Sequence, residues 1–157
     1  MTSPIGRLYI VANATHLLGL TMEVSWDREK RRFGSLLYRE NVIISLTKKE
    51  LREYFSKERE EFSIPLSFKG TSFQERAWRA LLDIPYGKTI SYEEQAKNID
   101  NPKAIRAIGG ANGANPIPII IPCHRVIRKS GDLGGYASGL EIKKFLLNLE
   151  NSKQSPQ

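Results

Sequence analysis

A cysteine directly followed by a histidine stands at the end of an apolar run, in the stretch IIIPCHRVI that spans residues 119–127. The chain has one cysteine and two histidines, so Cys123 and His124 bring two of its scarcest reactive side chains together. A cysteine thiolate is a strong nucleophile, and an imidazole can take up the thiol proton. The alternative is a small buried hydrophobe with no chemistry, which is common for a free cysteine. The pair therefore supports two hypotheses, a working thiol and a packing residue.

The apolar run before the pair restricts how the two side chains can cooperate. Pro116, Pro118 and Pro122 interrupt this run, which favours an edge strand or an irregular extended segment over a central strand. We expect the segment to be buried and to deliver Cys123 into a pocket. Adjacent side chains on a strand point to opposite faces. His124 can therefore assist Cys123 only where the backbone turns or where a water molecule bridges the two groups.

Length and composition exclude several classes of protein. A single cysteine cannot form an internal disulfide or supply a zinc site made of several thiolates. With 157 residues, of which 40% are hydrophobic, the chain has enough apolar material for one domain or two small ones. No apolar segment approaches the roughly 18 residues of a membrane helix, and the N-terminus lacks a charged leader. We expect a cytoplasmic protein that does not bind membranes.

The charge distribution points to a polyanionic partner. The formal net charge is +7, of which residues 1–66 carry +2 and residues 67–157 carry +5. No acidic residue lies between Asp100 and Asp132, and that window contains the Cys-His pair. Its basic residues are Lys103, Arg106, Arg125, Arg128 and Lys129. An acid-free basic stretch around a candidate nucleophile suggests that the site lies against nucleic acid, with phosphate contacts fixing its orientation.

The first part of the chain predicts a small α/β domain over residues 1–66. Two β-rich runs flank a turn at residues 13–15, which is typical of a hairpin. The charged segment 27–40 indicates a surface loop. Thr47 followed by Glu50 has the spacing of a capping box and predicts a helix over residues 47–57. Pro65 and Gly70 then interrupt regular structure and indicate an extended linker.

The second part, residues 67–157, predicts a mostly helical domain. Capping-box spacings occur at Ser72 with Glu75 and at Ser91 with Glu94, and Asn101-Pro102 is typical of the start of a further helix. Two short helices joined by a tight turn indicate a helix-turn-helix, although a plain αα-corner has the same pattern.

One side of the second helix of this pair carries almost no bulk, because it consists of Ala104, Ala107, Gly109, Gly110 and Ala111. Such a helix can approach another helix or a DNA duplex very closely, and Arg106 among these small residues favours DNA.

A last helix is predicted to begin at Ser138, where Glu141 completes another capping box. Its apolar residues are Ile142, Phe145, Leu146 and Leu149. Glu150 closes this helix.

The strings ISYEEQA, RAIGGANGANP, NPIPIIIPCHRVI and GGYASGLEIKKFLLNLE together resemble the O6-alkylguanine-DNA alkyltransferases. The resemblance covers residues 71–150, and PCHRV is its most specific motif; SPIGRLYIVA and LLGLTM add a looser match near the N-terminus. It implies repair of DNA by direct reversal, in which the alkyl group of a flipped O6-alkylguanine, or of O4-alkylthymine, passes irreversibly to Cys123. It also implies that His124 deprotonates Cys123 through a water molecule and that Glu150 orients His124.

The resemblance assigns further residues to the DNA and to the base. Arg106 would fill the space left by the flipped base in the minor groove, and Tyr92 would help to rotate the nucleotide out. Asn115 would brace the turn before the active-site segment, and Tyr136 would line the alkyl pocket. The amide of Ala137 and the carbonyls of Cys123 and Val126 would contact the edge of the guanine.

The partner implied is double-stranded DNA that contains O6-alkylguanine, bound by a monomer without a cofactor. Some relatives hold zinc in the N-terminal domain with cysteine and histidine ligands. The single cysteine of this chain, Cys123, is assigned to alkyl transfer, so we expect no metal site. Two rival classes remain. A non-enzymatic DNA-binding module would make Cys123 and His124 incidental, and a cysteine hydrolase would leave the glycine-rich helix unexplained.

Overall fold

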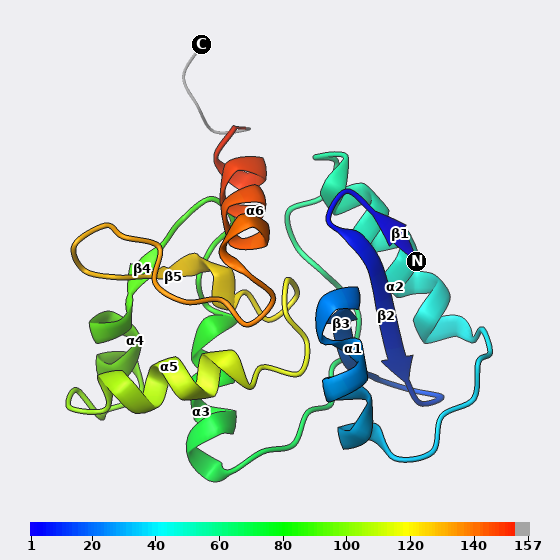
Figure 1. Cartoon of the computed structure of the whole chain (residues 1–157), viewed down its shortest axis with the longest axis horizontal. Helices are drawn as coiled ribbons and strands as arrows, with labels where there is room; N and C mark the ends of the chain where they lie inside the picture. Colours follow the sequence, from blue (N-terminus) through cyan, green and yellow to red (C-terminus); the bar gives the residue numbers. More distant parts are fainter. Residues whose placement is uncertain (153–157) are drawn as a thin grey trace. The chain divides into compact units, whose positions relative to one another are not determined.

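The computed structural model describes residues 1–152 and divides the chain into two units, Met1–Phe68 and Lys69–Gln157 (Figure 1). The sequence predicts the division after residue 66, and residues 153–157 of the predicted second domain lie outside the described part. The first unit contains β1 (Thr2–Ser3), β2 (Gly6–Ala12), β3 (Leu17–Met22), α1 (Glu23–Glu29), η1 (Lys30–Phe33) and α2 (Val42–Phe55). The second contains α3 (Ser72–Leu81), β4 (Ile90–Ser91), α4 (Tyr92–Asn98), α5 (Ile105–Gly113), η2 (Cys123–Arg125), β5 (Val126–Ile127) and α6 (Leu140–Ser152). The predicted fold class, a small antiparallel sheet with helices followed by a mostly helical domain, is confirmed.

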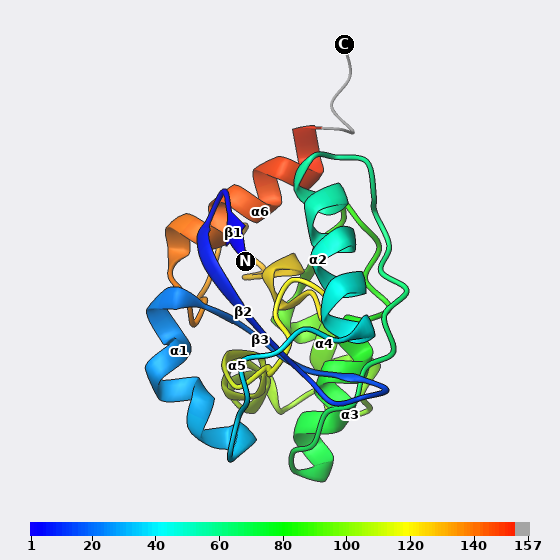
Figure 2. The same cartoon turned by 90° about the vertical axis from the view of Figure 1, so that its right-hand side faces the viewer.

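A β-hairpin organises the first unit. Strands β2 and β3 are antiparallel, with Tyr9 opposite Thr21, and β1 extends the sheet next to β2. The side-chain oxygen of Asn13 accepts hydrogen bonds from the backbone N–H groups of Thr15 and His16, at 2.9 and 2.7 Å. This local bonding explains why the predicted turn forms. Both α1 and α2 contact β2 (Figures 1 and 2).

The prediction of a surface loop for residues 27–40 is wrong for its first half, which continues α1 and then forms η1. The reason is a tertiary contact. Trp26 of α1 is buried and stacks on Tyr9 of β2, with 4.5 Å between the ring centroids and 1° between the planes. Aromatic stacking against the sheet stabilises a helix that its charged residues alone do not indicate.

Helix α2 begins at Val42, five residues before the predicted start at Thr47. Asn41 caps it, because its side-chain oxygen accepts from the backbone N–H three residues further on, at 2.8 Å. Thr47 and Glu50 therefore lie inside the helix and form no capping box. The buried carboxylate of Glu50 instead accepts from the backbone N–H of Ser63 at 2.8 Å, and so ties the following segment to α2.

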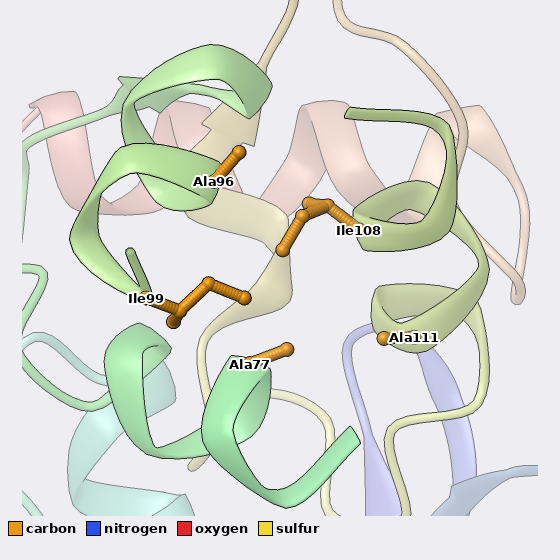
Figure 3. Close-up of a cluster of buried hydrophobic side chains, with 5 residues drawn as sticks. All are labelled: Ala77, Ala96, Ile99, Ile108 and Ala111. Atoms are coloured by element: carbon orange, nitrogen blue, oxygen red, sulfur yellow. The ribbon is translucent and has the colours of Figure 1, made fainter. Parts of the chain in front are cut away.

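Helices α3, α4 and α5 pack around one apolar cluster in the second unit. Its members are Ala77, Ala96, Ile99, Ile108 and Ala111, and Figure 3 shows the side chains of all three segments converging. Two polar contacts also hold α5. The side-chain amides of Gln95 and Asn112 exchange hydrogen bonds of 2.9 and 2.8 Å, and the indole N–H of Trp78 donates to the carbonyl of Ala111 at 2.8 Å. Because these groups are buried, the paired amides fix α5 against α4.

Three of the four predicted helix starts in this unit need correction and one is confirmed. Ser91 accepts from the backbone N–H of Glu94 at 3.1 Å, as its capping pattern predicts. Helix α3 is capped one residue earlier than predicted, by a capping box of Thr71 with Gln74. Helix α5 begins at Ile105, not directly after Asn101, because the chain leaves α4 through a left-handed residue and residues 101–104 form a turn.

The apolar run before the cysteine is buried as predicted, but it forms turns instead of a strand. The backbone N–H of Ile121 donates to the carbonyl of Ile117 at 2.8 Å, and Ile119 has a φ of 76°. A positive φ is strained for a β-branched residue and reverses the chain at this point. Cys123 then begins the short 3-10 helix η2.

Helix α6 begins at Leu140, two residues after the predicted start at Ser138. Gly139 has a φ of 108°, a conformation that cannot continue a right-handed helix, so Ser138 lies outside the helix. Glu150 lies in the last turn, two residues before the helix ends.

Candidate active site

The thiol of Cys123 lies at the bottom of a pocket and is only 8% exposed. Burial raises the pKa of the Cys123 thiol to about 11, although a hydrogen bond from the Asn115 side chain and the positive charge of Lys143 act in the opposite direction. A thiol with this pKa is protonated at neutral pH. It needs a base before it can act as a nucleophile.

The ring of His124 is fully buried and is held by one carboxylate. Its Nε2 lies 2.7 Å from an oxygen of Glu150. Since an ionised carboxylate only accepts hydrogen bonds, Nε2 carries the proton and Nδ1 is the basic nitrogen of the neutral ring. Among the residues that the structure describes, Nδ1 has no hydrogen-bond partner. The arrangement leaves a base available on the side of the ring opposite Glu150.

Arg125 belongs to the same group of side chains. The acid-free basic window that contains it predicts a surface facing nucleic acid, but Arg125 is only 6% exposed. Its Nε and Nη2 donate to the two oxygens of Glu150 at 2.9 and 3.1 Å, and its Nη1 donates to the carbonyl of Ile84 at 2.6 Å. Arg125 is therefore not part of an exposed basic surface, and it binds Glu150 in the bidentate geometry of strong ion pairs.

The electrostatics of the three residues favour a neutral histidine beside an ionised glutamate. Burial acts to raise the pKa of Glu150, but hydrogen bonds and charges from His124 and Arg125 outweigh it and lower the pKa to about 2. Burial lowers the pKa of His124, the bond to Glu150 raises it, and the charge of Arg125 lowers it, with a net decrease. His124 is therefore predominantly unprotonated at neutral pH, as a proton acceptor must be.

The pocket above Cys123 has a volume of about 700 Å³ and brings five of the predicted site residues together: Tyr92, Arg106, Cys123, Tyr136 and Ala137. Other lining residues come from α5 and the loop after β5, among them Gly109, Asn112, Gly113, Arg128, Gly134 and Gly135. The volume is typical of a site that encloses a small organic molecule. The lining therefore comes from α4 and α5 of the helix-turn-helix, from Cys123 in η2 and from the loop before α6.

The remaining predicted residues support the pocket without lining it. Asn115 is buried; its side-chain amide donates to the carbonyl of Ile121 at 2.7 Å and accepts from the N–H of Ile117 at 2.9 Å, so it bonds both ends of the turn before Cys123. The carbonyl of Cys123 accepts from the N–H of Val126. The carbonyl of Val126 accepts from Nζ of Lys143 at 2.8 Å.

Two functional candidates, Arg125 and Lys143, were not recognised from the sequence. A signal for Lys143 exists, because Lys143, Leu146 and Glu150 occupy positions i, i+3 and i+7 and so share one face of a helix. A lysine and a glutamate on a buried face need partners and are functional candidates for that reason.

The described residues contain no group of three or more His, Cys, Asp or Glu side chains that could hold a metal ion. Within the same residues, no helix is long and apolar enough to cross a membrane.

Acid is expected to destabilise the protein through Glu150. Its folded pKa of about 2 lies below the usual 4.5, so its contribution is complete above pH 4.5 and is lost as the pH falls toward 2. The loss amounts to about 3 kcal/mol in the free energy of unfolding. Urea unfolding of Glu150→Gln should depend less on pH over this range, whereas Glu141→Gln, an exposed change on the same helix, should behave like the wild type. Equal slopes in all three proteins would contradict the assignment.

Comparison with known proteins gives consistent matches over both units. The family model described as 6-O-methylguanine DNA methyltransferase, DNA binding domain, matches residues 72–152, and the model described as 6-O-methylguanine DNA methyltransferase, ribonuclease-like domain, matches residues 1–68. The constitutive methylated-DNA--protein-cysteine methyltransferase of Bacillus subtilis is 44% identical over 150 residues, which cover 94% of this chain and 91% of the relative. The methylated-DNA--protein-cysteine methyltransferase of Mycobacterium leprae is 48% identical over 150 residues, covering 96% and 89%.

Solved structures agree with these matches. The Mycobacterium tuberculosis O6-methylguanine methyltransferase superposes with a TM-score of 0.87 at 43% identity, covering 99% of this chain and 92% of that chain. The Mycobacterium tuberculosis OGT in complex with DNA superposes with a TM-score of 0.85 at 42% identity, covering 98% and 91%.

Proposed function

Because the chain belongs to the 6-O-methylguanine DNA methyltransferase family, we propose that it repairs DNA by transferring an alkyl group from O6 of guanine to its own Cys123. The bond between O6 and the alkyl carbon breaks, and a bond between that carbon and Sγ forms. The departing guanine anion takes up a proton from the solvent and regains its normal structure, and the protein keeps a thioether. The observation that carries this proposal is the thiol of Cys123 in the pocket with the His124 and Glu150 pair behind it.

The proton of Cys123 is proposed to pass to Nδ1 of His124 through a water molecule. Nδ1 is the basic nitrogen, and among the described residues it makes no direct hydrogen bond to the neighbouring thiol of Cys123. Glu150 holds the ring in the required tautomer and stabilises the imidazolium ion that forms, as the acidic member of a catalytic triad does. Arg125 keeps Glu150 ionised, so we propose that the proton stops on His124.

The target base must leave the duplex to reach Cys123, because the O6 substituent is inaccessible inside the base stack. We propose that Arg106 of α5 takes the place of the flipped base and that Tyr92 at the start of α4 contacts the nucleotide as it enters the pocket. Both residues line the pocket, and Arg106 is exposed.

The small residues of α5 favour a DNA duplex over a neighbouring helix. Gly109, Gly110 and Gly113 are exposed, and a Cβ atom added to any of them would meet nothing within 4 Å in the described structure. Ile108 and Ala111 occupy the opposite, buried face. The glycines therefore leave an exposed helix surface without side chains, which a DNA duplex can approach closely. We propose that this surface enters the minor groove.

The flipped base is proposed to be read by backbone groups, the N–H of Ala137 and the carbonyls of Cys123 and Val126. Each carbonyl already accepts one hydrogen bond, from Val126 and Lys143 respectively. A carbonyl oxygen has two lone pairs, so one remains for the base. Tyr136 is half-buried, lines the same pocket as Cys123 and would form the wall next to the alkyl group.

The proposed partner is duplex DNA that contains O6-alkylguanine or O4-alkylthymine, bound by a monomer in the cytoplasm without a cofactor. The relative solved with DNA supports the choice of partner.

The proposal is tested by intact-protein mass spectrometry after mixing the protein with duplex DNA that contains one O6-methylguanine. We expect a gain of one methyl group per protein molecule that maps to Cys123 and stops at one equivalent, even with excess DNA. A duplex with unmodified guanine is the control. A bound duplex with no mass gain would favour a DNA-binding module, and repeated turnover without a stable adduct would favour a hydrolase.

A further inference from the structure

A buried lysine bonds both strand β5 and the loop that lines the pocket. Lys143, in the first turn of α6, has 0% of its surface exposed. Its Nζ donates to the carbonyl of Val126 at 2.8 Å, to the carbonyl of Gly135 at 3.0 Å and to the carbonyl of Leu133. An ammonium group has three N–H donors, so each of them has an acceptor. This arrangement offsets the cost of burying the charge.

The three carbonyls belong to the two segments that form one side of the pocket. Val126 follows Cys123 by three residues. Leu133 and Gly135 lie three residues and one residue before Tyr136. We call residues 133–137 the pocket loop. Within the described part of the chain, residues 133–135 take part in no backbone–backbone hydrogen bond. Lys143 therefore provides two of the hydrogen bonds that hold the pocket loop near Cys123.

Tyr92 packs on the same loop. Gly134 has a φ of 73°, and a Cβ atom added there would lie 2.6 Å from the hydroxyl oxygen of Tyr92. The Nζ atom of Lys143 lies 5.9 Å from the centroid of the Tyr92 ring, within the range of a cation–π contact. The pocket loop is thus enclosed between Tyr92 and Lys143, and its position determines where Tyr136 and Ala137 lie relative to the thiol.

We propose that Lys143 is a positioning residue that holds the pocket loop in the conformation that receives the flipped base. The inference rests on the proposed alkyl transfer at Cys123. A lysine suits this role because its ammonium group directs three donors to three separate carbonyls, whereas the planar fork of arginine matches paired acceptors. A methionine of similar length would fill the space but would leave all three carbonyls without this donor.

The test compares two reactions of Cys123 in Lys143→Met, with Lys144→Met as the matched control. Lys144 is exposed and adjacent on α6. The first reaction is single-turnover methyl transfer from duplex DNA with one O6-methylguanine, which needs the pocket loop. The second is alkylation of Cys123 by iodoacetamide, which needs the thiolate but no base recognition. We expect Lys143→Met to slow methyl transfer by about 100-fold, the effect of a misplaced reacting group. The iodoacetamide rate should fall much less, because burial affects the pKa of Cys123 more than the charge of Lys143 does.

Limited proteolysis gives a second readout that a purely structural lysine would not change selectively. Cleavage within residues 133–137 should become faster in Lys143→Met, and cleavage within α6 should not. If Lys143→Met does not fold, the same measurements are made on Lys143→Gln.

Methyl transfer at the wild-type rate in the variant would overturn the inference, and so would an equal decrease of both rates, which would place the effect on the thiol. A wild-type protein that takes no methyl group from DNA would instead overturn the proposed function itself.

Discussion

Replacing Cys123 by serine is expected to abolish methyl transfer and to leave DNA binding intact. A serine hydroxyl is nearly the same size as the thiol, so the pocket should keep its shape. It is far less acidic than the thiol, and His124 cannot generate a useful alkoxide from it. Intact-mass spectrometry after incubation with the O6-methylguanine duplex should show no gain for Cys123→Ser. Fluorescence anisotropy with the same duplex should give an unchanged dissociation constant.

The same variant separates the rival classes of function. If the protein were a DNA-binding module, Cys123→Ser would match the wild type in every assay. A methyl group that appears on Cys123→Ser at another residue would contradict the assignment of the nucleophile.

Replacing His124 by glutamine is expected to slow methyl transfer at neutral pH by about 10²–10⁴-fold, the usual contribution of a general base. The glutamine amide can still donate to Glu150 but cannot take up a proton. His16→Gln is the matched control, because His16 is the other histidine and lies in the hairpin of the first unit, where its ring contacts the Thr15 hydroxyl at 2.7 Å. Single-turnover rates with the lesion duplex should be unchanged in that control.

The pH dependence should distinguish the loss of the base from a general disturbance of the site. In the wild type the rate should be nearly independent of pH above 6.5, because burial lowers the pKa of His124 below that value and the ring is already neutral. In His124→Gln the thiolate must form without the base, and the pKa of Cys123 is about 11. The rate should then rise by about tenfold for each pH unit between 7 and 9. Parallel profiles in the two proteins would refute the role of His124.

The sequence predicts well those elements whose stabilising hydrogen bonds join residues that are close together in the chain. Asn13 forms the hairpin turn through its own side chain, and Ser91 caps α4 through a backbone N–H three residues away. Elements that depend on distant partners are predicted poorly. Trp26 holds α1 through Tyr9, and Glu50 has the spacing of a helix cap but bonds Ser63, thirteen residues further on.

The candidate site shows the same contrast between residues predicted from local sequence and residues that depend on distant partners. The adjacency of Cys123 and His124 predicts a candidate nucleophile and a candidate base, and the family resemblance supplies the pocket residues. The acid-free window predicts a surface that faces nucleic acid, but Arg125 within it is buried. Its partners, Ile84 and Glu150, lie 41 and 25 residues away in the chain, so only the folded structure shows that it is buried.

The shared carboxylate of Glu150 also limits how this protein can evolve. One side chain holds both the base His124 and the buried guanidinium of Arg125. A substitution at Glu150 that altered the basicity of the ring would at the same time leave a buried charge without its partner, which typically costs about 3–5 kcal/mol. Selection therefore cannot adjust reactivity and stability separately at this position. Viable lineages should change the histidine, arginine and glutamate together or keep all three.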